Sequence, residues 1–314
     1  MNLLRRRRKR DFAPVNWRPL FSRKPKPTPR LMLCRHWPHH SKSSSYRPLA
    51  EGTGHVLELP YDDNQASRAR AVRELRRALK KYQPGQVHAI SGEKHLPALA
   101  AVRGEFTGIL SATVHQPPGA LEAFLEVPSN TLDGVVVVGP SQLPTVEAAF
   151  PQADCRFIAH GIDTEWFCPD PTVPKRKTAL CVGTHRRDYH TLQAAAAILA
   201  ETDPGIEVIA VYPSKRPKKF NDVPVEAMVN LTHANDLSEA AFRRTLQEAT
   251  LLALPLDSAT ANNSLLEGIA CGLPVVTTDL PDLHAYVDSS CAVFCAPGDA
   301  AALAAAIREL MHDP

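Results

Sequence analysis

The sequence lacks any apolar run long enough to cross a membrane as a helix, which needs about 18 to 20 such residues in succession. Its basic start, MNLLRRRRKR, is not followed by the apolar segment of a secretory signal peptide. Of its 314 residues, 44% are hydrophobic, which is enough for two domains of ordinary size that each bury a core. We therefore expect a globular, cytoplasmic protein.

Features that hold disulfides or metals are also scarce. The seven cysteines are an odd number without a C-x-x-C pair, and several lie in or beside apolar runs, so we expect them to be reduced. Three histidines, His36, His39 and His40, gather in the segment RHWPHHSKSSSY. No Cys or carboxylate completes a ligand set nearby, so an exposed loop is favoured over a metal site.

Acidic residues are almost missing from the first 30 positions. This stretch holds eleven Lys or Arg and one Asp, a net charge of +10, which leaves −7 for the remainder within the total of +3. Such a segment cannot build a core and should be disordered. It can be inert in solvent, attach to anionic lipid head groups or contact nucleic acid, but no base-reading motif supports the last.

From residue 31 onward, short apolar runs alternate with amphipathic segments. This alternation is typical of α/β domains with parallel sheets. The helix expected over 66–82 has an apolar stripe and an opposite face of six Arg and Lys, which is either solvated or rests on a membrane surface. The expected strands are 31–34, 56–59, 87–90, 109–114, 134–138, 178–183, 207–212, 251–256 and 274–278, and further helices are expected over 191–200, 238–250 and 300–311.

The stretch Leu251–Asp279 predicts a strand, a short helix and a second strand. Asn262, Asn263 and Ser264 are residue types that cap helix N-termini, and Gly272 is placed to end the helix. In an open parallel sheet, the crevice at the carboxyl end of the first strand faces the N–H groups of the helix start. The stretch therefore predicts an anion site.

Two motifs carry a resemblance to a known family. The run SLLEGIACGLPVV over 264–276 resembles the donor-site motif of family 4 glycosyltransferases (glycosyl transferases group 1), and 161–169 is similar to the hinge that ends their first domain. The resemblance implies the GT-B fold, in which two Rossmann-like domains face each other across a cleft. After the basic tail over 1–30, which the charge count defines, it predicts an acceptor domain over 31–163 and a donor domain over 164–314, with no segment left for the family's final crossing helix.

The resemblance assigns Glu267 to the ribose of a nucleotide, where a carboxylate can accept hydrogen bonds from two vicinal hydroxyls. The alternative is a capping box, in which Ser264 is the N-cap and Glu267 reaches back to its backbone N–H. Ala259 stands where the family has another Glu near the transferred sugar. That difference leaves open whether the chain is active.

Further site residues follow from the same resemblance. The loop that begins at Gly183 carries basic residues toward the diphosphate in the family; here Arg186 or Arg187 can take that role, or they can be a solvated pair at a helix start. A histidine after a strand of the first domain lines the family's cleft near the sugar. His115 matches it best and His88 is the second candidate, although either can be structural.

The implied function is transfer of a sugar, of the hexosyltransferase type, from a nucleotide diphosphate sugar to a hydroxyl of a glycan, lipid or protein. Retention at the anomeric carbon is expected and no cofactor is implied. The sequence has no D-x-D motif, which fits metal-independent chemistry with the diphosphate held by the helix start at Asn262 and Asn263. A catalytically impaired nucleotide-sugar-binding or assembly protein, and an epimerase or phosphorylase of the same fold, are the alternatives.

Overall fold

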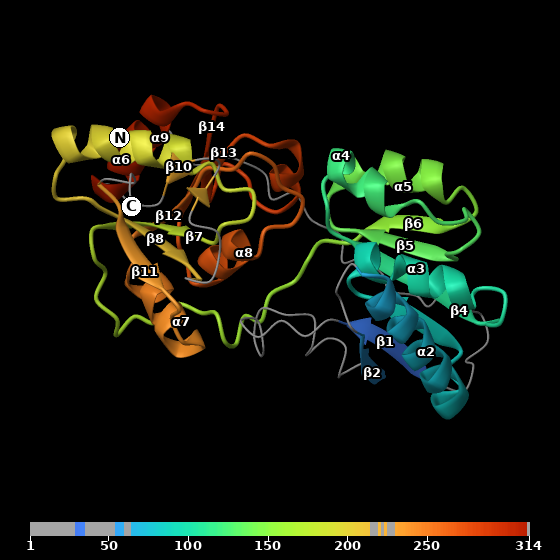
Figure 1. Ribbon diagram of the computed structural model, residues 1–314. Helices are drawn as coiled ribbons and strands as arrows, with labels where there is room; N and C mark the ends of the chain where they lie inside the picture. The colour runs from blue at the N-terminus through green and yellow to red at the C-terminus, as the bar shows by residue number, and fades with distance from the viewer. Residues whose placement is uncertain are drawn as a thin grey trace, which may run out of the picture.

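The computed structural model describes residues 29–34, 54–59, 64–213, 219–220, 223–224 and 230–312. Nearly all of the basic tail and the whole histidine-rich segment lie outside these ranges, so the expectations for both stay predictions. The described chain is built around two six-stranded sheets that lie side by side, and all strand pairs within them are parallel (Figure 1). The predicted α/β class is confirmed.

The first sheet has the strand order β2-β1-β3-β4-β5-β6. Helix α2 buries Leu75 fully against this sheet, as its apolar stripe predicts. The strands are β1 (Arg30–Cys34), β2 (His55–Glu58), β3 (Gln86–Ala89), β4 (Ile109–Val114), β5 (Gly134–Val137) and β6 (Asp154–Phe157). The helices are α2 (Gln65–Tyr82), α3 (Gly92–Val102), α4 (Pro118–Leu121), η1 (Glu122–Phe124), η2 (Pro140–Gln142) and α5 (Leu143–Ala149).

The second sheet has the order β11-β8-β7-β12-β13-β14. Its strands are β7 (Thr178–Val182), β8 (Glu207–Tyr212), β11 (Thr232–Asn235), β12 (Leu251–Leu254), β13 (Val275–Thr278) and β14 (Ala292–Cys295). The helices are α6 (Tyr189–Thr202), α7 (Glu239–Glu248), α8 (Asn263–Ala270), η4 (Pro281–Ala285) and α9 (Ala300–His312), and β9 (Lys219–Phe220) pairs with β10 (Val223–Pro224). The chain starts at β7, winds outward to β11 and then returns to β12. The order therefore reverses between β7 and β12, the place where sheets of this kind bind ligands.

Strand β7 shows why its apolar run reads as a strand buried on both faces. Ala179 and Cys181 point into a core formed with α6 and α9, whereas Leu180 and Val182 point into a second core that includes side chains of α7 and α8. Alternate side chains of a strand face opposite sides of its sheet, so both faces must be covered.

The connection between the two sheets packs mainly on the second one. Its Phe167 is buried in the core that contains Leu180, and its Asp163 accepts hydrogen bonds from the backbone N–H groups of Glu165 and Trp166 at 3.0 and 3.1 Å. This turn directs the chain from the end of β6 toward β7. The boundary after Asp163 stays a prediction.

Two further observations concern the described residues as a whole. No helix among them is both long and apolar enough to pass through a membrane. The seven cysteines, all within the described ranges, form no disulfide. The last helix, α9, packs against α6, and the expectation about a further crossing helix stays untested.

Candidate functional site

Two loops meet where the strand order of the second sheet reverses. The loop after β7 and the loop after β12 pair through a backbone bridge between Arg187 and Leu256. The backbone N–H of Asp257 donates to Arg186 at 3.1 Å, and that of Asp188 donates to Pro255 at 3.0 Å. The predicted site residues of both loops are therefore brought together at the carboxyl edge of this sheet.

Gly183 opens the first of these loops. Its φ of +87° lies in the left-handed region that favours glycine, and its backbone N–H donates to Val211 at 2.8 Å. A Cβ at this position would lie 3.1 Å from the guanidinium of Arg187. Glycine thus lets the loop turn sharply over that side chain.

The side chain of Arg187 connects the loop after β7 to the start of α8. Its side chain is buried and donates to the backbone carbonyls of Val182 and His185 at 2.7 and 2.8 Å. It also donates to Ser264 Oγ at 3.0 Å and Asn262 Oδ1 at 3.3 Å. A guanidinium has five N–H groups, and four are used here. The alternative of a solvated pair is therefore wrong for Arg187, which holds the loop to the start of α8.

Arg186 has the opposite environment. It is exposed, and its φ of +58° is unusual for a residue with a side chain. Of the two arginines, Arg186 is the one that can still turn toward a phosphate group.

Helix α8 begins earlier than the capping-box alternative requires. Asn262 is its N-cap and accepts from the backbone N–H of Leu265 at 3.2 Å, so Ser264 lies inside the first turn and donates to Val182 at 3.3 Å. Glu267 then lies two positions beyond the one from which a capping box reaches back. The capping-box interpretation is wrong because Asn262, an equally good capping residue, starts the helix two positions sooner.

Glu267 is buried on α8 in the neighbourhood of Arg187. Burial lowers the pKa of the Arg187 guanidinium, and electrostatic interactions with Cys181, Tyr189 and Glu267 offset part of that effect. A carboxylate and a guanidinium thus share the base of the site. Asn263, the first residue of the helix, is half-buried.

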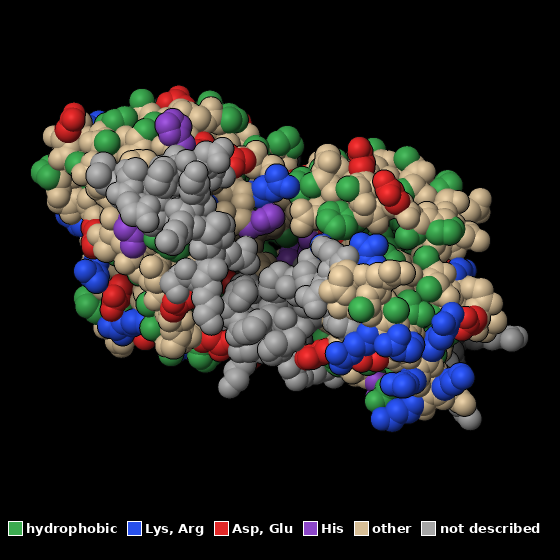
Figure 2. Space-filling model, in the orientation of Figure 1, with side chains coloured by type: hydrophobic (Ala, Val, Ile, Leu, Met, Phe, Trp, Pro, Cys, Tyr) green, Lys and Arg blue, Asp and Glu red, His purple; other side chains and the backbone are tan. Residues whose placement is uncertain are grey.

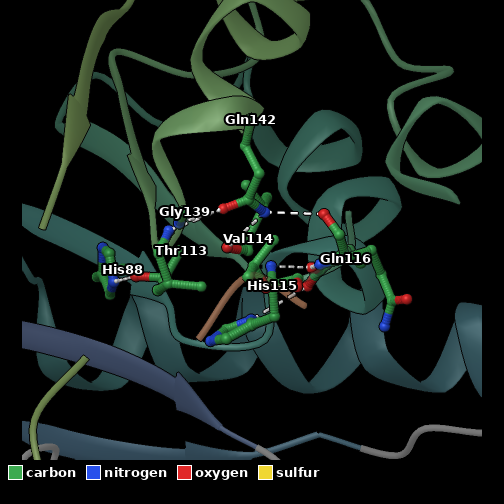
Figure 3. A network of polar contacts seen from close by, with 10 residues as sticks. His88, Thr113, Val114, His115, Gln116, Gly139 and Gln142 are labelled. Carbon is green, nitrogen blue, oxygen red and sulfur yellow. Dashed lines mark hydrogen bonds and ion pairs between the residues drawn. The ribbon is translucent and has the colours of Figure 1, made fainter. Parts of the chain in front are cut away.

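His115 lies directly after β4, at the carboxyl edge of the first sheet. Its backbone N–H and that of Gln116 donate to Oε1 of Glu93, the second at 2.8 Å, and its ring Nδ1 lies 3.4 Å from Oε2 of the same carboxylate. Gln142 donates to the carbonyls of Val114 and Gln116 at 3.2 and 2.8 Å (Figure 3). The backbone on both sides of His115 is held by buried side chains.

His88 has a structural environment. Its two ring nitrogens lie 2.9 Å from the hydroxyls of Ser111 and Thr113 on the neighbouring strand. Burial, with a smaller contribution from His115, lowers the pKa of His88 to about 4. Both nitrogens are engaged within the sheet, so the structural alternative holds for this histidine.

The two halves of the chain touch beside His115. Thr260, in the loop that leads to α8, donates from Oγ1 to the carbonyl of His115 at 2.6 Å. Asp282 accepts from the backbone N–H and the hydroxyl of Ser141 at 2.9 and 2.6 Å, and a Cβ at Gly139 would collide with its carboxylate. Figure 2 shows a hollow between the halves with histidine side chains at its surface. His115 and the α8 loop therefore border one site.

Sequence reasoning missed Glu93, Gln142, Thr260 and Asp282. The one signal available was Glu93, a carboxylate two positions before the mostly apolar segment HLPALAAV, where a buried charge needs a partner. The others act on residues more than 25 positions away in the sequence. Within the described ranges, no three His, Cys, Asp or Glu side chains gather as a metal site would require.

Comparison with known proteins agrees with the motifs. Residues 176–313 match the family of glycosyl transferases group 1. The chain is 26% identical over 237 residues to glycogen synthase of Mycobacterium tuberculosis, an alignment that covers 73% of this chain and 54% of that protein. The chain therefore spans about half the length of the curated relatives it matches.

Solved structures confirm the architecture. Sucrose-phosphate synthase from Thermosynechococcus elongatus is similar with a TM-score of 0.71 at 16% identity, covering 91% of this chain and 80% of that one. Anabaena HepE in complex with UDP and glucose is similar with a TM-score of 0.67 at 15% identity, covering 91% and 90%. At these identities the likeness shows the fold, and the predicted GT-B resemblance is confirmed.

Proposed function

We propose that this chain, which carries the group 1 glycosyltransferase match on a GT-B fold, transfers a sugar from a nucleotide diphosphate sugar to a hydroxyl group. The observation that carries the proposal is the convergence of the Gly183 loop, the start of α8 and Glu267 at the point where the strand order reverses. A nucleotide diphosphate has the anionic and diol groups that such a place can bind. HepE, a protein of the same fold, is described with UDP and glucose bound.

The donor is recognised by three elements. The diphosphate lies toward the N–H groups of the first turn of α8 and the exposed Arg186, because both favour negative charge. The ribose hydroxyls bind Glu267. Arg187 supports these elements without touching the donor, since its side chain is buried and four of its five N–H groups donate to Val182, His185 and the α8 start. This division replaces the sequence-based hypothesis that either arginine serves.

His115 orients the transferred sugar or the acceptor hydroxyl from the opposite half. The leaving phosphate itself takes the proton of the acceptor hydroxyl, and the sugar is transferred with retention. The charge that develops on the leaving diphosphate is stabilised by fixed N–H donors and Arg186, so no metal ion enters the reaction. The acceptor is a hydroxyl of a glycan, lipid or protein.

A specific observation favours a second candidate. Ala259, where the family has a carboxylate, packs partly buried against the apolar core of the second half. Ala in place of this Glu is expected in a protein that binds a nucleotide sugar, or serves in an assembly, without turnover. Such a protein would still bind the donor. An epimerase or phosphorylase shares the fold but would give a different product.

Product analysis separates these functions. We expect incubation with a panel of nucleotide sugars, with and without a hydroxyl acceptor, to release the nucleoside diphosphate and to form a glycoside in both Mg²⁺ and EDTA. A changed sugar on an intact nucleotide would indicate an epimerase, and tight binding without product would indicate the impaired protein. Turnover that disappears in EDTA and returns only with a divalent ion would contradict the metal-independent part of the proposal.

We place the protein in the cytoplasm, on the inner face of an anionic membrane. Two basic segments support this: the tail over 1–30 and the outer face of α2, where Arg73, Arg77, Lys80 and Lys81 are exposed. Figure 2 shows the basic side chains gathered over this helix. Each basic residue near an anionic bilayer contributes about 1 kcal/mol of attraction. Nucleic acid is not proposed as a partner, because no base-reading motif accompanies the charge.

Liposome sedimentation tests the membrane contact. A chain that starts at Leu31 should bind anionic vesicles at least tenfold more weakly than the full chain, since several basic residues are lost at about 1 kcal/mol each. The difference should shrink at high salt and vanish on neutral vesicles. Equal binding of both forms to anionic vesicles would remove the tail from the proposal.

A further inference from the structure

Both carboxylate oxygens of Glu93 contact His115, a residue of the proposed site. Its side chain is buried at the start of α3, where Oε1 accepts the backbone N–H groups of His115 and Gln116. Oε2 faces the His115 ring, 3.4 Å from Nδ1. One carboxylate therefore fixes the backbone of His115 and the side of its ring that carries Nδ1.

Two further side chains, Gln142 and Thr260, hold the backbone at His115. Gln142 is fully buried, accepts from the backbone N–H groups of Val138 and Gly139, and donates to the carbonyls on either side of His115. Thr260 of the other half holds the His115 carbonyl. The position of the His115 backbone is set by the protein before any substrate arrives, which is what a site residue on a rigid element requires.

Glu93 is an ionised neighbour of the His115 ring. Burial alone would raise the pKa of Glu93, but the attraction of His115 and the hydrogen bonds from its side chain and backbone outweigh burial, so the pKa is lowered. His88 and His160 also interact electrostatically with His115. Burial is the largest cause that lowers the pKa of each of these two histidines to about 4. Near neutral pH these two histidines are neutral and Glu93 is an ionised acceptor.

We propose that Glu93 is the positioning residue of His115 in sugar transfer: its carboxylate holds the backbone N–H groups of His115 and Gln116 and keeps a proton on Nδ1 of the ring. The inference rests on the proposed function. A neutral imidazole carries its proton on one nitrogen, and the partner of that nitrogen selects the tautomer. A carboxylate can only accept, so the nitrogen that faces it is the protonated one.

Glu93→Gln tests this assignment with little change of shape. The amide oxygen can still accept the two backbone N–H groups, whereas the amide NH₂ now faces Nδ1 and donates to it. We expect the ring of His115 to change to the tautomer protonated on Nε2, and kcat to fall about 100-fold, the loss expected when a group that orients a substrate is misplaced. The KM for the donor should change little, because the donor elements lie on the other half.

The tautomer is read from ¹⁵N chemical shifts of ring-labelled histidine in the full chain, with the His115 signal identified by its loss in His115→Asn. Glu74→Gln, the same change on a partly exposed carboxyl of α2, is the matched control and should alter neither tautomer nor turnover. A wild-type ring that carries a proton on Nε2 and none on Nδ1 would overturn the proposal even if the Gln variant failed to fold. A changed tautomer with full turnover would overturn it as well.

The spectrum is recorded without substrate, so it separates this inference from the proposed function. If the wild-type protein turned over no nucleotide sugar while its ring carried the proton on Nδ1, the transfer reaction would be refuted and the pairing of Glu93 with His115 supported.

Discussion

Replacing Glu267 with Gln is expected to weaken the binding of nucleoside diphosphates by roughly 1.5 to 3 kcal/mol, which is about 10- to 150-fold in Kd. The substitution keeps the shape of the side chain and removes its charge. Glu267 is buried on α8 beyond the position of a capping box, so loss of a helix cap cannot account for a change. A charge-assisted contact with the two ribose hydroxyls can. Ala259 supplies no second carboxylate, which concentrates donor recognition on Glu267.

Calorimetric titration with nucleoside diphosphates measures this effect, and thermal melts of the same samples check the fold. Glu309→Gln, the same change on an exposed position of α9, is the matched control and should bind like the wild type. A nucleoside monophosphate retains the ribose, so its weaker binding should be reduced by a similar factor. Unchanged affinity in Glu267→Gln at an unchanged melting temperature would remove the ribose assignment.

The central strands of both sheets could be predicted from sequence, because their runs of apolar residues are buried on two faces. The edge strands of the second sheet could not. Strand β11 has the sequence THAN with no fully buried residue, and β14, AVFC, buries only Ala292 and Cys295. An edge strand gains its place from the pairing of its backbone with one neighbour, as β11 does with β8, and this pairing leaves little pattern in the side chains.

The location of the candidate site was also predictable, since it follows from the strand-helix-strand pattern around α8. The different roles of the residues within this site could not be predicted. Arg186 and Arg187 are adjacent and chemically identical, yet one is exposed and the other buried beneath the loop, because the backbone turns at Gly183. Asn262 and Ser264 are both good capping residues, and only the packed structure decides which one starts the helix.

Contacts between the halves depend on the whole fold. Thr260 belongs to the loop of the proposed donor site and donates a hydrogen bond to the backbone carbonyl of His115. A shift of this loop would therefore change a contact of His115 on the proposed acceptor side. Tyr286 adds to this junction by donating to the carbonyl of Val138 at 2.5 Å and accepting from the backbone N–H of His160 at 3.0 Å. These residues are separated by more than 120 positions, and no local pattern relates them.

The two arginines should respond to substitution in opposite ways. Arg187→Ala is expected to lower the free energy of unfolding by roughly 3 to 5 kcal/mol, because it removes a buried side chain and leaves two carbonyls, Asn262 and Ser264 without their donor. In a chain of this size that is a fall in melting temperature of roughly 10 °C. Arg186→Asn is expected to change stability by less than about 0.5 kcal/mol, since the site is exposed and Asn tolerates a positive φ.

Nucleoside diphosphate affinity should follow the reverse order. Arg186→Asn removes a charge that faces the diphosphate and should weaken binding by roughly 1.5 to 3 kcal/mol, while the matching nucleoside is bound as before. Arg187→Lys keeps a positive charge but cannot donate to four acceptors at once, so it should be destabilised much like the Ala variant. Thermal melts and titrations of these three proteins decide the matter. A stable Arg187→Lys protein with lost diphosphate affinity would show that the buried arginine, rather than the exposed one, meets the phosphate.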